Sequence, residues 1–262
     1  MFATERQERI LRRVRLTGSV RVSDLVEELA VSDMTVRRDI ATLAEQGLVA
    51  RVHGGATSVD AGAFPGVPAP RALDGPARGP GSEVRSAIAA EVAARIEPGT
   101  TVALTGGSIT LDVAVALGAV EGLTVVTNSL PAADALTAAG GPHVTVVLTG
   151  GRRTRSGLLV GPVVAASLIG LGAAWSILGA RGIDDQAGLT VPNRAEAVAE
   201  KALLSLGAKV LCAVESSRWQ TVSLHSVVAL PEVDVLVTDS RLRPTARRLL
   251  EDEVGELVLA PV

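Results

Sequence analysis

Two adjacent arginines, Arg37 and Arg38, are the residues near the start of the chain whose type and spacing suggest a specific chemistry. A guanidinium group donates paired hydrogen bonds to guanine or to phosphate, and neighbouring residues of a helix point about 100° apart. One arginine can therefore read a base while the other binds a phosphate, although the pair alone could equally be a solvated pair on an ordinary helix. With the hydroxyl groups and basic residues around them, the candidate DNA-binding residues are Ser32, Thr35, Arg37, Arg38, Thr42, Arg51 and His53.

A second group of candidate residues, rich in glycine and hydroxyl groups, lies in the second half of the chain. Gly106 and Gly107 allow backbone N–H groups to approach a ligand, and Ser108 and Thr110 add hydroxyl groups where a helix is expected to begin. A helix N-terminus favours an anion, so we interpret this segment as an anion site, with a plain strand-to-helix turn as the alternative. Polar residues near the other predicted strands complete the candidate effector-binding set: Gly106, Gly107, Ser108, Thr110, Asn128, Gly150, Gly151, Arg152, Arg181, Lys201, Glu215, Ser216 and Arg218.

The composition argues against several other classes of function. With no Tyr, two Phe and two Trp, the chain has few rings for stacking on bases, which argues against a single-strand or RNA binder. The one cysteine, Cys212, excludes an internal disulfide and a thiolate metal cluster, and its apolar surroundings predict an unreactive thiol in a buried strand. The three histidines lie far apart in the sequence, so we expect no bound metal and no cofactor.

The start of the chain, MFATER, is charged and lacks the apolar core of a signal peptide. Residues 157–180 carry no charge and superficially suit a membrane span. Pro162 and several glycines interrupt them, so we expect a short helix and a strand of a buried α/β segment instead. We therefore expect a cytoplasmic protein without membrane contact.

The residues that surround the arginine pair predict a helix-turn-helix. Ser23 and Ser32 are favourable N-caps for two successive helices, and only Val31 lies between the end of the first and the cap of the second. Helices joined so tightly form a crossed pair. With an earlier amphipathic helix, the predicted helices cover residues 5–14, 24–30 and 33–46.

A strand over residues 48–52 and a tight turn at 53–55 predict a small β wing after these helices. Arg51 and His53 are then placed to contact the DNA backbone or the minor groove. Residues 1–56 hold nine arginines against eight acidic residues, so charge alone does not indicate DNA binding. Asp39 is expected to orient an arginine, because phosphates repel a carboxylate.

The remainder of the chain predicts an α/β domain behind a linker. Residues 57–82 contain five prolines and five glycines, which indicates a flexible linker. Over residues 83–262, helical patterns alternate with short β-branched runs, which predicts a mainly parallel sheet covered by helices. The predicted strands are 101–104, 123–127, 143–148, 175–180, 209–214 and 233–238, and the predicted helices are 83–96, 109–118, 131–139, 162–170, 193–206 and 244–250. The expected organisation is a winged helix-turn-helix (1–56), a flexible linker (57–82) and an α/β domain for effector sensing and oligomerisation (83–262).

These motifs resemble the DeoR family of bacterial transcriptional regulators. The N-terminal match consists of ERQERI at 5–10, VSDMTVRRDI at 31–40, QGL at 46–48 and RVHGGA at 51–56. The second half matches at LTVVTNSL (123–130), LTGG (148–151), LVGP (159–162), GA (179–180), GID (182–184) and GLT (188–190). The resemblance implies an effector domain that shares a fold with sugar-phosphate isomerases and binds a phosphorylated sugar.

The candidate pocket departs from the family pattern at several positions. Where the family has roughly DSGTTT, this chain has TGGSIT at 105–110, so an acid and a hydroxyl group are missing. GADG becomes GARG at 179–182, DSSK becomes ESSR at 215–218, and VKR becomes AEK at 199–201. These changes remove acids, add an arginine and move the lysine about 100° around its helix, so the effector could be atypical or sensing could be weakened.

The leading hypothesis is a DNA-binding transcriptional regulator, a repressor of a carbohydrate-metabolism operon that a sugar phosphate or related anion releases. Its partners would be a double-stranded operator and a second copy of the chain, in a dimer or tetramer, because two-fold operators need paired half-sites. One alternative is a C-terminal domain that only oligomerises. Another is an isomerase-like enzyme, but Thr105 replaces the expected acid and only Glu215 and Glu200 remain as bases, so we expect no enzyme activity and no catalytic residues.

Overall fold

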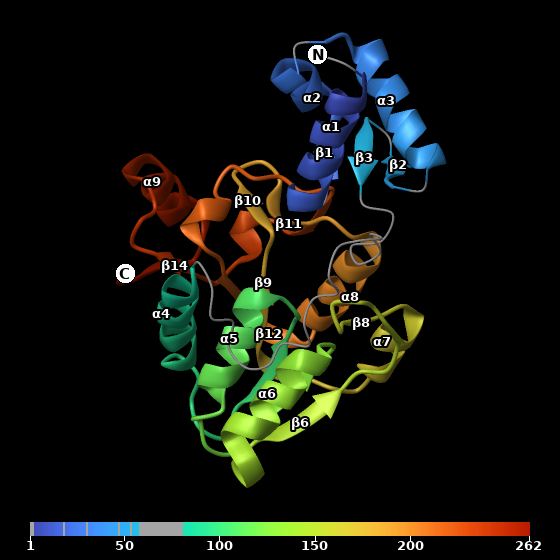
Figure 1. Ribbon diagram of the computed structural model, residues 1–262. Helices are drawn as coiled ribbons and strands as arrows, with labels where there is room; N and C mark the ends of the chain where they lie inside the picture. The colour runs from blue at the N-terminus through green and yellow to red at the C-terminus, as the bar shows by residue number, and fades with distance from the viewer. Residues whose placement is uncertain (1–2, 18, 30, 47, 53, 58–80) are drawn as a thin grey trace. The chain divides into compact units, whose positions relative to one another are not determined.

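The computed structural model describes residues 3–17, 19–29, 31–46, 48–52, 54–57 and 81–262. The chain divides into two compact units, Met1–Ala69 and Pro70–Val262, each of which is described by itself. In Figure 1 the described part of the first unit is blue, and that of the second runs from teal to red. Each unit has its own hydrophobic core.

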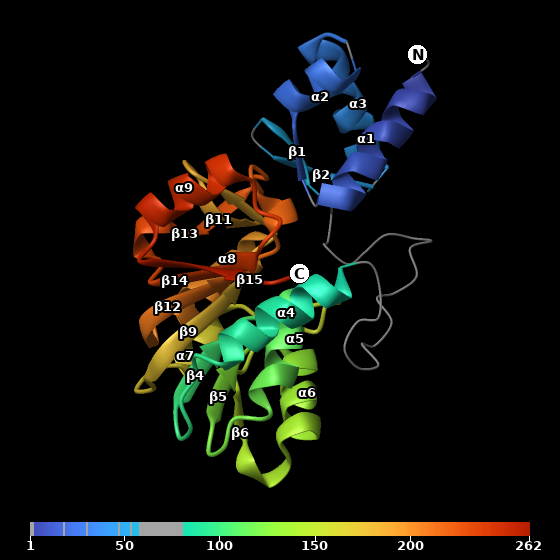
Figure 2. The same cartoon turned by 90° about the vertical axis from the view of Figure 1, so that its left-hand side faces the viewer.

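The N-terminal unit packs three helices, α1 (Ala3–Thr17), α2 (Val22–Leu29) and α3 (Asp33–Glu45), around one small core (Figure 2). Apolar residues recur every three to four positions on each helix, so they form one inward stripe. This arrangement confirms the predicted helix-turn-helix. The fully or nearly fully buried side chains are those of Ile10, Val14, Leu25, Val36, Ile40 and Leu43.

The wing is a three-stranded antiparallel sheet with the strand order β1-β3-β2. Its strands are β1 (Ser19–Arg21), β2 (Ala50–Val52) and β3 (Gly55–Thr57). The sequence predicted the wing from β2 and its turn but not β1, which lies between the first two helices and pairs with β3.

The start of α2 differs from the prediction that Ser23 caps it. The helix begins at Val22, two residues before the predicted start at Asp24, and the Val22 N–H donates a hydrogen bond of 2.8 Å to the carbonyl oxygen of Gly54. The Ser23 hydroxyl instead donates to the Asp24 carboxylate beside it. The wing therefore accepts a hydrogen bond from the first residue of α2, and Ser23 lies inside the helix and not at its cap.

The C-terminal unit is built on a seven-stranded sheet in which every neighbouring pair runs parallel. It confirms the predicted α/β fold class. Across the sheet the strands are β15 (Glu256–Ala260), β14 (Val235–Asp239), β12 (Gly207–Ala213), β9 (Ala173–Gly179), β4 (Thr101–Leu104), β5 (Thr124–Thr127) and β6 (Thr145–Leu148).

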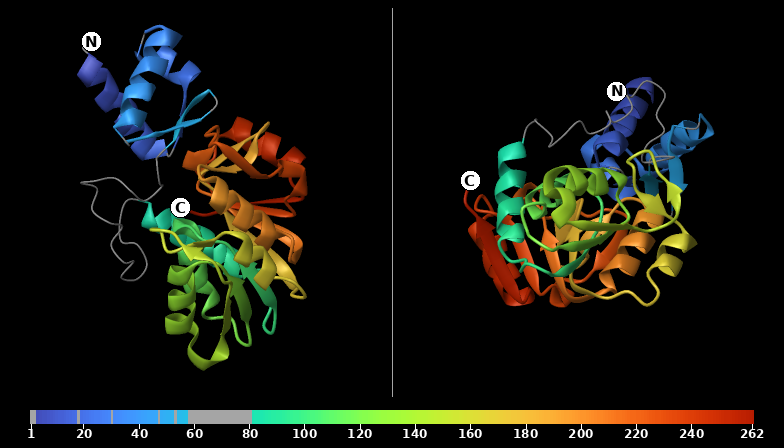
Figure 3. Two further views of the ribbon diagram at one scale, coloured as in Figure 1. Left: turned by 90° about the vertical axis from the view of Figure 1, so that its right-hand side faces the viewer. Right: turned by 90° about the horizontal axis from the view of Figure 1, so that it is seen from below.

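Helices cover both faces of this sheet, as a parallel sheet requires (Figure 3). One face packs against α4 (Ser82–Ala93), α5 (Ser108–Leu117) and α6 (Leu130–Gly140). The other packs against α7 (Pro162–Ser167), α8 (Arg194–Leu204) and α9 (Pro244–Glu253). Cys212, on β12, is completely buried, and burial raises the pKa of its thiol, so the expectation of an unreactive cysteine agrees with its surroundings.

Smaller elements extend from the ends of the main strands. An antiparallel sheet contains β10 (Gly182–Asp184), β11 (Gly188–Val191) and β13 (His225–Val228), and a hairpin contains β7 (Arg152–Arg153) and β8 (Leu159–Val160). Short 3-10 helices cover Gly141–His143, Ser216–Arg218 (η2) and Leu230–Glu232. In the described ranges, we find no helix with the length and apolar character to cross a bilayer.

The strand order reverses direction between β4 and β9. From β4, the chain adds β5 and β6 on one side, whereas β9, β12, β14 and β15 follow one another on the other side. Loops at such a reversal leave on opposite faces of the sheet, so a crevice opens beyond the carboxyl ends of the two strands. In sheets of this kind, ligands bind in that crevice.

Candidate functional site

The first turn of α3 is fixed by a serine cap, as predicted. Ser32 has extended backbone angles, and its Oγ accepts a hydrogen bond of 3.3 Å from the backbone N–H of Thr35. The two hydroxyl groups lie 2.8 Å apart and share a hydrogen bond. Ser32 and Thr35 thus begin the helix and remain exposed or half-buried beside its arginines.

The two adjacent arginines of α3 are both exposed but differ in their surroundings. The guanidinium of Arg37 pairs with the carboxylate of Asp33, one turn earlier, and this pairing raises the pKa of Arg37. Arg38 makes no ion pair with another described residue. The arginine pair therefore offers one pre-oriented guanidinium and one that is available to a ligand such as guanine or phosphate.

Asp39 faces away from this surface and orients an arginine of another helix. It is 4 % exposed, and its carboxylate accepts hydrogen bonds of 2.5 Å from Nε and 3.2 Å from Nη2 of Arg6. Gln7 donates a third hydrogen bond of 3.1 Å. The expectation that Asp39 orients an arginine is confirmed, and its partner is on α1 rather than on α3.

The other candidate DNA-binding residues have less defined roles. The Thr42 hydroxyl donates to the carbonyl oxygen of Arg38, so it is used inside the helix. Arg51 lies on β2, but the structure describes only its backbone. His53 lies outside the described residues. The sequence analysis missed Met34, which is 77 % exposed in the first turn of α3 and could contact a thymine methyl group. The sequence signal for Met34 was an apolar residue of α3 that does not belong to the inward stripe of this helix.

In the C-terminal unit, the loop after β4 leads into α5 at the strand reversal. Gly107 is the N-cap of α5, and no side chain caps the first N–H groups of this helix. Ser108 is exposed there, whereas Thr110 is buried and donates a hydrogen bond of 3.2 Å to the Gly107 carbonyl oxygen. Uncapped N–H groups beside one exposed hydroxyl are a favourable setting for an anion, and of the two candidates only Ser108 presents its hydroxyl there.

Beside this terminus, three polar side chains occupy equivalent positions on adjacent strands. Leu104 pairs with Thr127, and Thr127 with Leu148, so the next residues, Thr105, Asn128 and Thr149, lie at one level. Side chains alternate between the faces of a strand, so these three share the face that packs against α7 and α8. We call Thr105, Asn128 and Thr149 the polar row.

Each member of the polar row has a buried oxygen without a hydrogen-bond partner among the described residues: Thr105 Oγ1, Asn128 Oδ1 and Thr149 Oγ1. Buried polar atoms are nearly always paired, so unpaired atoms at one edge of a sheet indicate that a ligand or water completes them. Of these three, the sequence analysis placed only Asn128 in the candidate effector-binding set. Thr105 and Thr149 also follow predicted strands, but the strand register that brings the three together is not visible in the sequence.

The β7–β8 hairpin covers the polar row and the first glycine of the loop. The Asn128 side-chain amide donates a hydrogen bond of 3.0 Å to the Leu159 carbonyl oxygen. The Leu159 N–H donates a hydrogen bond of 2.7 Å back to the Asn128 carbonyl oxygen. A Cβ atom at Gly106 would lie only 1.9 Å from Cδ2 of Leu158, so a glycine is needed for this approach. The candidates Gly150, Gly151 and Arg152 lead into this hairpin, and Arg152 is exposed.

Two glutamates, Glu196 and Glu200, lie on α8, which packs against the same face of the sheet as the polar row. Glu200 is 2 % exposed, and its Oε2 has no hydrogen-bond partner among the described residues. Burial, together with the nearby charge of Glu196, raises the pKa of Glu200 well above its usual value, and Arg181 partly offsets this. Burial also raises the pKa of Glu196.

Lys201 does not share the inward position of its neighbour Glu200. It is exposed, and its charge, with that of Arg194, adds to burial in lowering the pKa of His225 on β13. Arg181, in contrast, is near enough to Glu196 and Glu200 to affect the pKa of both. Of Lys201 and Arg181, only Arg181 is therefore placed near Glu196 and Glu200.

The candidates after β12 belong to a network of ion pairs and hydrogen bonds. Arg85 Nε donates a hydrogen bond of 2.8 Å to Asp112 Oδ2, and Arg85 Nη1 lies 4.0 Å from Glu215 Oε1. Burial raises the pKa of Asp112, although Arg85 partly counteracts it. Ser216 donates both its N–H and its hydroxyl to Asp239, and Arg218 is half-buried at the end of η2. Glu215 and Ser216 therefore already have protein partners. Their partners Arg85, Asp112 and Asp239 were not in the candidate effector-binding set.

These residues offer no evident metal site. No group of three or more His, Cys, Asp or Glu side chains in the described ranges could hold a metal ion. The site combines an open helix terminus, unpaired hydroxyl and amide oxygens and one buried acid, which suits a ligand that carries an anionic group and several hydroxyl groups.

Comparison with protein families matches both units of the chain. Residues 6–61 match the DeoR-like helix-turn-helix domain, and residues 81–240, more than half of the chain, match the DeoR C-terminal sensor domain. The chain belongs to the DeoR family. This DeoR-family protein is thus a DNA-binding transcriptional regulator, with α3 as the second helix of its helix-turn-helix.

Relatives of similar length carry names of the same kind. The DeoR-family chain is 29 % identical over 260 residues to the glycerol-3-phosphate regulon repressor of Escherichia coli K12, covering 99 % of this chain and 100 % of that protein. It is 30 % identical over 258 residues to the transcriptional repressor AccR of Agrobacterium fabrum, covering 98 % and 97 %. Among solved structures, ribose 5-phosphate isomerase A of Methanocaldococcus jannaschii aligns with a TM-score of 0.40 and 14 % identity, over 53 % of this chain and 55 % of that one.

Proposed function

We propose that this DeoR-family regulator represses an operon of carbohydrate metabolism and leaves its operator when a phosphorylated sugar or a related anion binds. The observation that carries the effector part is the polar row of Thr105, Asn128 and Thr149 beside the uncapped N-terminus of α5. The names of relatives as repressors support the direction of control.

On the DNA side, α3 enters the major groove with its first turns. The exposed guanidinium of Arg38 is the candidate for base recognition or a phosphate contact, and Arg37, Ser32 and Thr35 complete this end of the helix. An operator with two half-sites requires at least two copies of the chain. Contacts between the C-terminal units would join them in a dimer or tetramer.

On the effector side, the phosphate group binds the first N–H groups of α5 and the Ser108 hydroxyl. The sugar hydroxyl groups then pair with the polar row and with Glu200, whose raised pKa leaves it able to donate as well as accept. Since Leu158 lies on Gly106 and the row is enclosed, effector entry requires movement of the β7–β8 hairpin. Release of DNA follows only if the effector favours the arrangement that binds DNA poorly.

The test begins with an operator selected from a random duplex pool by the full-length protein at near-physiological salt. Pentose and hexose phosphates are then screened for release of this operator and for thermal stabilisation. A ligand at a hundred times its Kd adds about 2.7 kcal/mol of stability. A protein without sequence preference would contradict the regulator proposal, and a screen without any response would favour a C-terminal unit that only oligomerises.

A matched pair of variants tests the polar row itself. Thr149→Val removes one unpaired hydroxyl of the row, whereas Thr238→Val removes a hydroxyl that is equally buried and unpaired but lies on β14. Thr149→Val should weaken the effector response by about fivefold, in line with one lost hydrogen bond, and Thr238→Val should leave it unchanged. Equal responses of the two variants would remove the polar row from the site.

We infer that the protein does not turn over sugars. Glu215 and Glu200 were the two candidate bases, but Glu215 lies beside Arg85, and burial raises the pKa of Glu200 well above its usual value, which favours the protonated form that cannot accept a proton. Measurable isomerisation of a pentose or hexose phosphate that Glu215→Gln abolishes would contradict this inference.

A further inference from the structure

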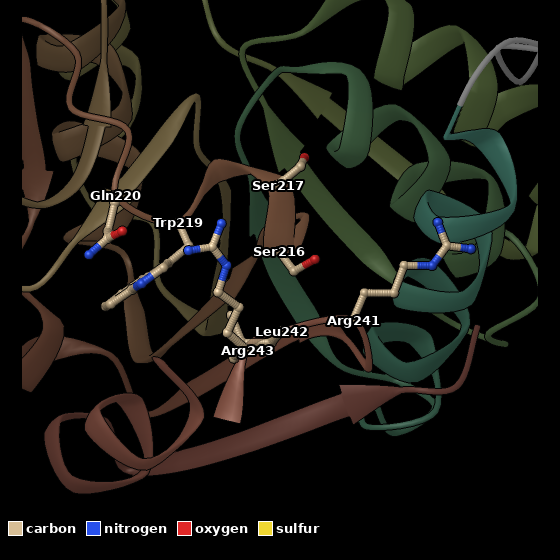
Figure 4. Close-up of a pocket in the computed structure, with 7 residues that line it drawn as sticks. All are labelled: Ser216, Ser217, Trp219, Gln220, Arg241, Leu242 and Arg243. Carbon is tan, nitrogen blue, oxygen red and sulfur yellow. The ribbon is translucent and has the colours of Figure 1, made fainter. Parts of the chain in front are cut away.

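A cavity of about 220 Å³ lies at the carboxyl ends of β12 and β14, away from the strand reversal between β4 and β9. One wall comes from the segment after β12, with Ser216, Ser217, Trp219 and Gln220. The other comes from the loop between β14 and α9, with Arg241 and Arg243. Figure 4 shows the two arginine side chains leaving this loop on either side of Ser216.

One buried carboxylate holds both walls of the cavity in place. Asp239 is 1 % exposed and accepts hydrogen bonds of 2.7 Å from the Ser216 N–H and 2.8 Å from the Ser216 hydroxyl. It also accepts a hydrogen bond of 3.2 Å from the Arg241 N–H. Because three donors already engage this carboxylate, it shapes the cavity without leaving an unpaired negative charge in it.

The charge that remains at the cavity is positive. Arg241 and Arg243 are exposed, and neither forms an ion pair with another described residue, whereas Arg247 on the next turn pairs with Glu251. Arg243 is also the N-cap residue of α9, a ten-residue helix whose first N–H groups receive no side-chain cap. Two guanidinium groups and an uncapped helix terminus all favour an anion at this position.

The remaining wall adds a hydroxyl group and an aromatic face. Ser217 is exposed, and Trp219 is half-buried beside it. Gln220 has a φ of 59°, in the left-handed region that non-glycine residues rarely adopt, and this turn places its amide among the lining side chains. The cavity can therefore bind an anionic group through the arginines while carbon atoms of the same ligand lie near the indole ring.

We propose that this cavity is a second ligand site, which binds a small phosphorylated metabolite through Arg241 and Arg243. It shares Ser216 with the candidate effector-binding set, but neither the polar row nor the N-terminus of α5, which carry the proposed effector contacts. It therefore does not depend on that proposal, and a regulator with this site could respond to two metabolites.

The two tryptophans of the chain make a direct test possible. Trp175 lies near the start of β9, at the amino ends of the strands, whereas the cavity lies at the carboxyl ends. Lys209 Nζ lies 5.3 Å from the centroid of the Trp175 ring. In the full-length Trp175→Phe protein, Trp219 is the single tryptophan, and the chain has no tyrosine. Its emission is measured while inorganic phosphate, glycerol 3-phosphate, ribose 5-phosphate or glucose 6-phosphate is added at constant ionic strength. We expect a saturable change with at least one of these probes.

The arginine pair is then replaced in the same Trp175→Phe background. Arg241→Gln with Arg243→Gln should weaken binding of the probe at least about tenfold, because both charge-assisted contacts are lost. Arg248→Gln removes one exposed arginine of α9 outside the cavity and should leave the Kd unchanged. Thermal melting checks that each protein is folded, and the two single arginine variants replace the double variant if it is not.

Three results would overturn the proposal. The first is no saturable change of Trp219 emission with any of the four probes. The second is equal binding of the probe by the arginine variants and their parent. The third is a change of Trp219 emission that duplex DNA causes and that none of the four probes causes. The last would assign the arginines to nucleic acid.

Discussion

Arg6 of α1 and Asp39 of α3 form an ion pair with two hydrogen bonds inside the N-terminal unit, in which Asp39 is almost fully buried and Arg6 is half-buried. The pair joins the first helix to the helix that carries Arg37 and Arg38. Its carboxylate lies on the inner side of α3, one residue from an exposed arginine. The orientation of the DNA-binding helix therefore depends on a charge that does not itself face DNA.

Loss of this pair should destabilise the N-terminal unit. Asp39→Asn should lower the free energy of unfolding of that unit by about 1–3 kcal/mol, because the buried carboxylate that accepts hydrogen bonds from Arg6 and Gln7 loses its charge. Amide hydrogen exchange in α1 and α3 of the full chain measures the effect. Asp33→Asn removes an exposed carboxylate of the same helix and should cost about 1 kcal/mol or less. Equal costs would show that Arg6–Asp39 is no more important than a surface pair.

Removal of the available guanidinium should weaken operator binding. Arg38→Ala should cost about 1–3 kcal/mol of binding free energy for the selected operator, through a lost base or phosphate contact. Titrations of operator and of scrambled duplex at one salt concentration measure this cost and assign it to base recognition or to phosphate binding. Arg12→Ala removes an exposed arginine of α1 and serves as the control. Normal operator binding by Arg38→Ala would exclude the first turns of α3 as the recognition surface.

The contact between Gly106 and Leu158 should appear as a strong coupling between two substitutions. Gly106→Ala places a methyl group 1.9 Å from the Leu158 side chain and should lower stability by about 1–3 kcal/mol. Leu158→Ala leaves a cavity and should cost about 2–5 kcal/mol. The double variant should be more stable than the sum of the two losses predicts, because the new methyl group fills part of the space. Urea unfolding of the four proteins measures the coupling, and simple additivity would contradict the packing of the hairpin on the loop.

The raised pKa of Glu200 predicts a pH-dependent stability. The folded protein binds a proton at Glu200 over a pH range in which the unfolded chain, with the usual value of 4.5, has lost it. The stability that Glu200 contributes is therefore complete below that value and is lost as the pH rises toward the folded pKa. The stability of Glu200→Gln relative to wild type should accordingly rise between about pH 4 and pH 8.

Melting temperatures of wild type and Glu200→Gln across this range measure the difference. Glu253→Gln removes an exposed carboxylate on α9 and is the matched control for loss of a carboxyl group. If the Glu200→Gln difference does not change with pH relative to this control, the buried carboxyl does not titrate as its surroundings predict.

Several elements could be predicted from the sequence because local rules determine them. Alternating hydrophobic periods and glycine-rich turns defined the strand over residues 101–104, which is β4, and Ser32 capped α3 as its residue type requires. The terminal strand β15 and the sheet of β10, β11 and β13 were not predicted. β10 and β11 form a hairpin of very short strands, whereas β13 and β15 pair with residues farther away in the sequence, which no local pattern reveals.

The sequence by itself determined the helix-turn-helix, the α/β class and the glycine-rich start of α5, since each depends on neighbouring residues and on hydrophobic period. Only the tertiary structure decided which polar groups meet. Strand register brought Thr105, Asn128 and Thr149 to one level, helix rotation put Glu200 rather than Lys201 inside, and packing paired Asp39 with Arg6. These contacts join residues that are up to tens of positions apart, so they arise from the arrangement of whole elements in space and not from any single segment.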